Sequence, residues 1–271
     1  MIRRSAPVVA FLAAGLALSG WSVVPPSVEA PAPCAPAPAV VAHRGGTERA
    51  MENTVGAFRA AGAAGVTTWE LDVHFDVRGT PVVLHDATVD RVSPLSGPVA
   101  QLDAGNRGIP TDDGQYVPTL REVYAEAVAH EAFVLTELKV TPTAEQWRAV
   151  ADEIDRSVGR DAVLIMSFSR DVVLAARDHV PGARTGLLHT AGYLHADQIR
   201  EYGDAFLKSY SAISASRATE WRAGGIRLYA WTVNQEADWP RMAAMPVDEI
   251  ITDRPIAYRA WAARQCAVGG S

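Results

Sequence analysis

Short groups of ionisable residues recur through the first half of this chain, each beside an apolar run. They are His43-Arg44-Gly45, Glu52-Asn53-Thr54, Glu70-Leu71-Asp72, His85-Asp86 and Glu137-Leu138-Lys139. Ionisable side chains at the ends of successive strands are what a barrel enzyme uses to gather catalytic groups on one face. Two histidines, three carboxylates, an arginine and a lysine together suit a metal-assisted attack on a phosphate ester.

Three of these residues carry carboxylates that could share a cation. Glu70 and Asp72 are two residues apart in an expected strand, so both side chains point to the same face. Two carboxylates facing one way repel each other unless a cation lies between them or water solvates them. Glu137 ends another expected strand, and three converging carboxylates suit Ca²⁺ or Mg²⁺. His74 continues the same face, either as a fourth ligand or as a packed histidine.

The histidines and the two cationic side chains fit acid–base and phosphate-binding roles. His43 and His85 each follow a strand, and imidazole titrates near neutral pH. We therefore expect one to act as general base and the other as general acid. Arg44 offers a bidentate guanidinium, and Lys139 adds a point charge for phosphate oxygens. Asp86 is expected either to pair with His85 or to cap the next turn.

Two further motifs allow both a structural and a functional interpretation. Asn53 and Thr54 open a helical pattern, and either can cap it. The functional alternative is that Glu52 and Asn53 hold His43 or the substrate. Trp231 ends a late strand, where it is either core or an aromatic plate beside a polyol substrate.

Alternating apolar runs and helical patterns would position these residues. Strands are predicted at Val40–His43, Thr67–Asp72, Pro81–His85, Ala132–Lys139, Ala162–Phe168, Arg184–Leu188, Ala205–Lys208, Arg227–Val233 and Asp248–Thr252. Helices are predicted at Asn53–Ala64, Leu120–His130, Ala144–Val158, Asp171–His179, Ala218–Ala223, Trp239–Met245 and Ile256–Gln265. Such alternation is typical of a parallel sheet with helices outside. In a chain of 271 residues, about eight strands favour an α/β fold of the TIM-type (β/α)8 barrel class.

One connection departs from this alternation. Between Asp72 and Pro81 the chain is too short for a crossover helix, and Gly79-Thr80 has the composition of a turn. We expect an extended excursion there, and hence an irregular barrel between the second and third strands. The insertion that follows the third strand, from Ala87 to Pro118, lacks periodicity. Loops longer than about 12–15 residues are usually functional or disordered, so we expect this one to cover or line the active-site mouth.

The N-terminal segment is expected to lie outside the fold. Arg3-Arg4 supplies a positive start, and the stretch from Pro7 to Val24 is almost continuously apolar. Residues 1–30 therefore read as a secretory signal peptide, with a retained membrane anchor as the alternative. Residues 31–38 read as an extended Pro/Ala linker, and residues 39–268 as one barrel domain. Export predicts a secreted protein.

The charge of the chain limits the partners that it can bind, and its cysteines bear on whether it contains a disulfide. The chain has 25 basic and 31 acidic residues, a net charge of −6, and no cluster of lysines or arginines, which excludes a nucleic-acid footprint. An anionic substrate must therefore be drawn by a local cationic site. The two cysteines, Cys34 and Cys266, lie just before the first strand and in the last helix. In an exported protein such a pair indicates a disulfide, with two free thiols as the alternative.

Taken in order, these motifs resemble those of the glycerophosphodiester phosphodiesterase family, within the superfamily of phospholipase C-like phosphodiesterases. Two later segments also match, Trp231-Thr232-Val233-Asn234 and Thr252-Asp253-Arg254-Pro255, so that the similarity spans about residues 40 to 262. The resemblance implies a TIM-type barrel without a normal helix between its second and third strands. It also implies a divalent metal on Glu70, Asp72 and Glu137, an acid–base pair in His43 and His85, and phosphate contacts from Arg44 and Lys139. Glu52 matches a supporting position.

The resemblance further implies a reaction. The substrate's glycerol hydroxyl would attack phosphorus and expel an alcohol, and water would open the resulting cyclic phosphate to give glycerol 3-phosphate. Val92-Ser93 stands where the family often has two threonines, which leaves the preferred alcohol open. A membrane contact is possible but not indicated, and the oligomeric state stays open.

Three other functions remain as alternatives. A phospholipase D-like enzyme of the same superfamily would act on lysolipids or sphingomyelin, and an apolar rim around the pocket would favour it. A non-catalytic ligand-binding barrel would need none of the catalytic groups. A glycosidase would use paired carboxylates but not the two histidines, Arg44 or Lys139.

Overall fold

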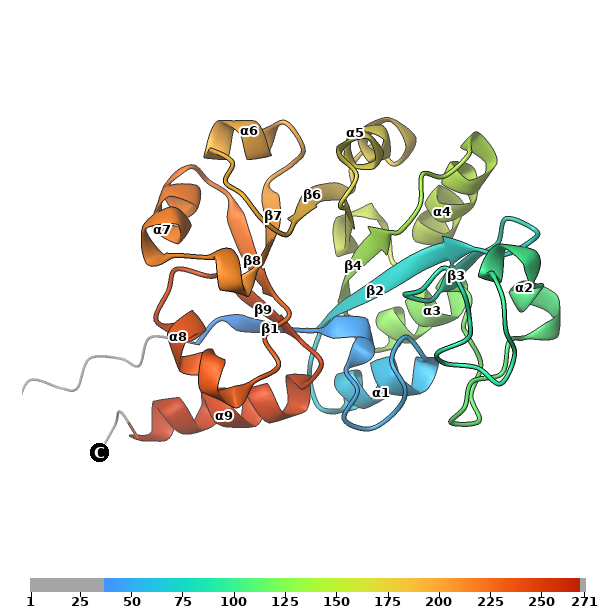
Figure 1. Cartoon of the computed structure of the whole chain (residues 1–271), viewed down its shortest axis with the longest axis horizontal. Coiled ribbons are helices and arrows are strands. Elements are labelled where there is room, and N and C mark those ends of the chain that lie inside the picture. The colour runs from blue at the N-terminus through green and yellow to red at the C-terminus, as the bar shows by residue number, and fades with distance from the viewer. Residues whose placement is uncertain (1–36, 269–271) are drawn as a thin grey trace, which may run out of the picture. The chain divides into compact units, whose positions relative to one another are not determined.

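Within residues 37–268, which the computed structural model describes apart from the side chains of residues 106, 107 and 266–268, eight parallel strands close into a barrel (Figure 1). They are β1 (Ala39–Ala42), β2 (Thr68–Phe75), β4 (Phe133–Leu138), β5 (Val163–Ser167), β6 (Arg184–His189), β7 (Ala205–Ser209), β8 (Arg227–Trp231) and β9 (Glu249–Thr252). β1 pairs with both β9 and β2, which closes the ring. The predicted TIM-type barrel is confirmed.

The barrel strands are apolar on both faces. Side chains that pack together inside the barrel include Val41, Leu135, Leu164, Leu188, Leu207 and Ile251. Their neighbours along the chain, such as Val134 and Ile165, belong to a second cluster that packs against the helices. Because both faces of a parallel sheet are covered, its strands read as continuous apolar runs, and this made them recognisable in the sequence.

Helices surround the strands (Figure 1). They are α1 (Val55–Ala63), α2 (Ala104–Arg107), α3 (Leu120–Ala129), α4 (Ala144–Arg156), α5 (Arg170–His179), α6 (Ala196–Arg200), α7 (Ala215–Ala223), α8 (Trp239–Ala243) and α9 (Pro255–Val268). Single 3-10 turns lie at His43–Gly45, Val99–Gln101, Arg160–Ala162, Tyr210–Ala212 and Glu236–Asp238. Thr119 and Thr143 start α3 and α4 through capping boxes with Glu122 and Gln146, which explains their sharp N-terminal ends.

The predicted irregularity between the second and third strands is present, but its form differs from the expectation. β2 continues to Phe75, and the chain then reverses in a tight turn, so that β3 (Pro81–Val83) pairs antiparallel with β2. The Asp76 carboxylate accepts the backbone N–H groups of Arg78 and Thr80 and stabilises this turn. The connection is therefore a hairpin and not an extended excursion, and β3 flanks the barrel instead of belonging to its ring.

The stretch from Ala87 to Pro118 folds around its own apolar cluster. Val89, Val92, Val99 and Ile109 are buried there, together with Val82 of β3. Figure 1 shows α2 and this stretch beside β3, at one side of the barrel. The insertion is thus a small packed unit built on the β2–β3 hairpin.

The predictions for the chain ends fall beyond what the structure describes. The signal peptide, most of the linker and Cys34 precede residue 37, and the Cys266 side chain is not described, so export and the disulfide stay predictions. Among the described helices, none combines the length and the apolar character that crossing a membrane requires. The barrel itself runs from Ala39 at the start of β1 to Val268 at the end of α9.

Candidate active site

The ionisable motifs meet at the end of the barrel where the parallel strands finish. His43 follows β1, Lys139 follows β4, and Trp231 ends β8. Together with nine further residues they line a cavity of about 120 Å³. The full lining is His43, Arg44, Glu70, His85, Glu137, Lys139, Met166, Phe168, Leu188, Trp231, Thr232 and Ile251. Parallel strands bring their carboxyl ends to one face, which is why motifs far apart in the sequence converge here.

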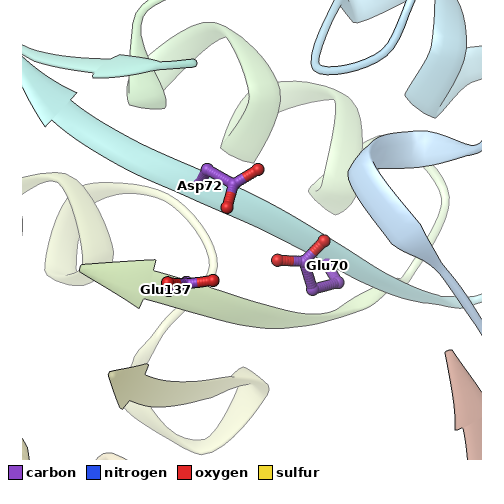
Figure 2. Close-up of side chains that lie close together, drawn as sticks. All are labelled: Glu70, Asp72 and Glu137. Carbon is purple, nitrogen blue, oxygen red and sulfur yellow. The ribbon is translucent and has the colours of Figure 1, made fainter. Parts of the chain in front are cut away.

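Three buried carboxyl groups form one cluster at this cavity. Glu70 and Asp72 share a face of β2, and the strand register sets Asp72 opposite Glu137 on β4. The three residues are between 1% and 6% exposed, and one oxygen of each lies within 4.8 Å of the others. Figure 2 shows the three groups gathered on the two adjacent strands. The predicted convergence of Glu70, Asp72 and Glu137 is present in the structure.

Burial and mutual repulsion act on the protonation of this cluster. Burial, with the negative charges of Asp72 and Glu137 beside it, raises the pKa of Glu70 well above its ordinary value. Burial and Asp72 likewise raise the pKa of Glu137 to about 7. In the absence of a cation, burial and repulsion therefore favour the protonated forms of Glu70 and Glu137. A divalent cation would replace those protons and remove the repulsion.

Two cationic side chains flank Asp72. Lys139 Nζ lies 3.3 Å from Asp72 Oδ1 and 3.0 Å from Glu137 Oε1, while Arg44 Nε lies 3.3 Å from Asp72 Oδ2. Burial acts to raise the pKa of Asp72, but Lys139 and Arg44 outweigh it, so the pKa lies below its ordinary value. Asp72 is therefore the carboxylate that carries a negative charge at neutral pH.

A buried amide side chain, that of Asn53, lies beside Asp72. Asn53 Nδ2 donates to Asp72 Oδ2 at 2.9 Å, whereas its buried Oδ1 has no hydrogen-bond partner among the described residues. A buried carbonyl oxygen without a donor is costly unless a cation or a ligand uses it. Three carboxylates with an amide oxygen beside them fit Ca²⁺ or Mg²⁺, which prefer oxygen ligands.

The Nδ1 atom of His43 is hydrogen-bonded to a carboxylate. This short hydrogen bond is to Asp253, which directly follows β9. Burial acts to raise the pKa of Asp253, but the bond to His43 outweighs it and the pKa is lowered, so Asp253 is an anion that accepts the Nδ1 proton. Asn234 hydrogen-bonds both the backbone N–H and the side chain of Asp253. The other ring nitrogen of His43, Nε2, lies 3.9 Å from Glu70 Oε2.

His85 has the same arrangement with its neighbour in the sequence. Its Nδ1 lies 2.6 Å from Asp86 Oδ1, which decides the open question about Asp86 in favour of pairing. Hydrogen bonds from Arg91 and His85 lower the pKa of Asp86 to about 2, despite partial burial. The acid cluster consists of Glu70, Asp72 and Glu137 without His74, whose Nε2 contacts the backbone carbonyl of His85 at 3.2 Å. His74 therefore fixes the chain at His85.

The turn after β1 places Arg44. Arg44 has a left-handed backbone with φ of 54°, and its N–H donates to Glu70 Oε2 at 2.9 Å. Gly45 follows with φ of 82°, and a Cβ atom there would lie 2.9 Å from the backbone nitrogen of Phe58 in α1. Only glycine allows this turn to pack so closely against the helix.

Glu52 contacts Arg44 and is not among the residues that line the cavity. Its Oε1 accepts Arg44 Nη1 at 3.0 Å, so in this structure its carboxylate contacts the arginine, and a role of Glu52 in substrate binding stays a prediction. No described residue from 87–118 is among those that line this cavity, and the expectation that the insertion covers the mouth of the site stays a prediction. The insertion contacts the site through Arg91, which donates hydrogen bonds to Asp86 and Glu52.

Apolar side chains form the opposite wall of the cavity. Trp231 donates its Nε1–H to the Leu207 carbonyl at 2.8 Å, and its ring lies nearly perpendicular to that of Phe168, with ring centroids 5.6 Å apart. Met166 and Leu188 extend this wall. Charged groups thus occupy one side of the cavity and carbon surface the other, which suits a substrate with a phosphate and a short carbon skeleton.

Comparisons with known proteins agree with this geometry. Residues 43–257 match the model of the glycerophosphoryl diester phosphodiesterase family. A glycerophosphodiester phosphodiesterase from Caldanaerobacter subterraneus is 29% identical over 230 residues, covering 80% of this chain and 94% of that protein. Human glycerophosphodiester phosphodiesterase 1 is 28% identical over 237 residues, covering 72% of this chain and 71% of that protein.

A solved structure shares the fold. An Oleispira antarctica phosphodiesterase in complex with the product sn-glycerol-3-phosphate superposes with a TM-score of 0.76 at 22% identity, covering 84% of this chain and 97% of the other. The matched region contains every motif of the cavity from His43 to Asp253. The chain belongs to the glycerophosphoryl diester phosphodiesterase family, and it is an enzyme, a phosphoric diester hydrolase.

Proposed function

We propose that this protein hydrolyses glycerophosphodiesters to glycerol 3-phosphate and an alcohol, by acid–base catalysis with two histidines and with a divalent metal. The observation that carries the proposal is the meeting of two histidine–carboxylate pairs and an acid cluster in one cavity. His43 and His85 each bond a carboxylate through Nδ1, which leaves two Nε2 atoms for proton transfer. Such a pair can move the two protons of a phosphodiester cleavage.

The first half of the reaction would use the substrate's own hydroxyl group. One histidine accepts its proton through Nε2 while the hydroxyl oxygen attacks phosphorus. The bond to the departing alcohol breaks, and the other histidine donates a proton to the alkoxide. The products of this step are an alcohol and a cyclic phosphate. Arg44 and Lys139 stabilise negative charge on the phosphoryl oxygens.

The second half reverses the two roles. The histidine that lost its proton takes one from water, the hydroxide attacks the cyclic phosphate, and the other histidine returns a proton to the glycerol oxygen. A cation held by Glu70, Asp72 and Glu137 would supply Lewis-acid stabilisation of the phosphoryl charge. Both histidines end in their starting protonation states, which permits repeated turnover.

Release of glycerol 3-phosphate from glycerophosphocholine by the purified protein tests this proposal. The assay is run with Ca²⁺, with Mg²⁺ and with EDTA, and parallel samples contain lysophosphatidylcholine or sphingomyelin. Turnover that EDTA abolishes supports the proposal. Turnover that persists in EDTA would contradict the proposed dependence on a divalent metal. Hydrolysis of the lipids alone would favour the phospholipase D-like alternative, which the exposed Phe168 at the apolar wall makes worth testing.

Metal affinity is expected to rise with pH. Cation binding must displace protons from the two carboxyl groups whose pKa values are raised, Glu137 to about 7 and Glu70 well above its ordinary value. Below about pH 7, displacement of the Glu137 proton costs about tenfold in apparent affinity per pH unit, and displacement of a Glu70 proton acts in the same direction. Isothermal titration with Ca²⁺ or Mg²⁺ between about pH 6 and pH 8 should therefore show Kd falling as the pH rises, with protons released. A Kd independent of pH would contradict this.

A further inference from the structure

Arg91 connects two parts of the active site that do not contact each other directly. It lies in the insertion after β3, five residues beyond Asp86. Its Nε lies 2.6 Å from Asp86 Oδ2, and its Nη2 lies 2.6 Å from Glu52 Oε1. One guanidinium group thus holds two carboxylates that come from different segments of the chain.

Each of those two carboxylates also accepts a hydrogen bond from a residue that lines the cavity. Asp86 uses its other oxygen, Oδ1, for His85 Nδ1 at 2.6 Å. Glu52 Oε1 also accepts Arg44 Nη1 at 3.0 Å. The contacts form a continuous series from His85 through Asp86, Arg91 and Glu52 to Arg44. Arg91 is therefore in a position to fix the general acid or base relative to the phosphate-binding arginine.

The planar guanidinium group suits this task and a lysine does not. Two nitrogens of one rigid fork face two carboxylates, whereas an ammonium group is a single point of charge on a flexible stem. The side chain of Arg91 is 47% exposed, and exposed ion pairs contribute little to global stability. The contacts of Arg91 are thus better explained by a role in orienting the groups of the active site than by a contribution to the stability of the fold.

We propose that Arg91 is a positioning residue that aligns His85 and Arg44 through Asp86 and Glu52, and that this alignment is a function of the insertion. The proposal rests on the proposed function, because it assigns an effect on that reaction. Arg91 itself does not line the cavity. It acts on kcat through the groups that it holds.

The test compares Arg91→Met with a matched control. Arg121 is also exposed and makes a bidentate pair, with Glu153 at 2.9 and 2.8 Å, on helices away from the cavity. We expect Arg91→Met to lower kcat on glycerophosphocholine about 10- to 100-fold, because a misplacement of about 1 Å in a catalytic group can cost about a hundredfold in rate. Arg121→Met should keep wild-type kcat, and both variants should melt within a few degrees of wild type. Arg91→Lys should recover only part of the loss.

Two further readouts separate orientation from damage to the fold. Millimolar guanidinium should raise the activity of Arg91→Met and leave Arg121→Met unchanged. Arg91→Met combined with Asp86→Asn or with Glu52→Gln should lose less than the product of the single losses, because each pair acts as one unit. Equal losses in the Arg91 and Arg121 variants, or full additivity with both partners, would overturn the proposal.

A spectroscopic measurement keeps this test independent of turnover. The Nδ1 proton of His85, bonded to Asp86, is followed by NMR in the full protein and assigned by its loss in Asp86→Asn. Arg91→Met should broaden or shift that resonance, and Arg121→Met should not. Inactive wild-type protein would contradict the proposed function alone. An unperturbed His85 signal in Arg91→Met would contradict the positioning role.

Discussion

Glu70→Gln is expected to abolish metal-dependent turnover, by at least about 10³-fold, while the metal-free protein melts no lower than wild type. The pKa of Glu70 is raised well above its ordinary value, first by burial and then by Asp72 and Glu137. An amide resembles the protonated acid that burial favours at this position, and it can still accept the backbone N–H of Arg44. The fold therefore loses little, and repulsion within the cluster decreases.

Catalysis, in contrast, loses the charge that balances a divalent cation. Lewis-acid stabilisation by a bound metal is worth several kcal/mol, and each 1.36 kcal/mol corresponds to a factor of about ten in rate. The measurements are kcat/KM in saturating Ca²⁺ or Mg²⁺ and the shift in Tm that the ion produces. Both the turnover and the shift should be lost together.

A buried carboxyl group at the other end of the barrel provides the control. Glu249 is 3% exposed and pairs with Arg227, outside the acid cluster and the cavity lining. Glu249→Gln should lower stability while retaining the metal-induced shift and the turnover. If Glu70→Gln keeps a metal-induced shift equal to that of wild type, Glu70 is not a ligand and the metal assignment fails.

The sequence predicted those parts of the fold and site that depend on local pattern. Glu70 and Asp72 were expected on one face because side chains alternate along a strand. The apolar runs of the barrel strands were visible because both faces of these strands are covered. In contrast, α6 was missed, since this five-residue helix buries only Ile199 and so leaves no periodic pattern.

Contacts between distant segments could not be predicted in this way. The contact of Asp72 with Glu137 depends on the register of β2 and β4, which no local pattern specifies. Asp253 contacts His43 across 210 residues, and the sequence offered it only as part of a family motif. Arg91 lies in an aperiodic stretch, where nothing in the pattern marked it. The direction of β3 was also missed, because the turn depends on hydrogen bonds to one aspartate, Asp76.

His43→Gln and His85→Gln are each expected to lower kcat on glycerophosphocholine by about 10²- to 10⁴-fold, the usual contribution of a general acid or base. KM and the metal-induced shift in Tm should change little, because neither histidine belongs to the acid cluster. His195→Gln is the matched control. His195 is exposed and pairs through Nδ1 with Glu220 at 3.3 Å, away from the cavity, so this variant should keep wild-type activity.

A substrate with a better leaving group should then distinguish the two histidines. The p-nitrophenyl ester of glycerol 3-phosphate expels a phenolate that needs no proton, so loss of the general acid should cost little with it. Removal of the proton from the attacking hydroxyl is still required, so loss of the general base should cost as much as before. One variant should therefore recover on this ester and the other should not. Each histidine bonds its own carboxylate through Nδ1, so the proposal assigns each Nε2 a different proton. Recovery of both variants, or of neither, would contradict this division of roles between His43 and His85.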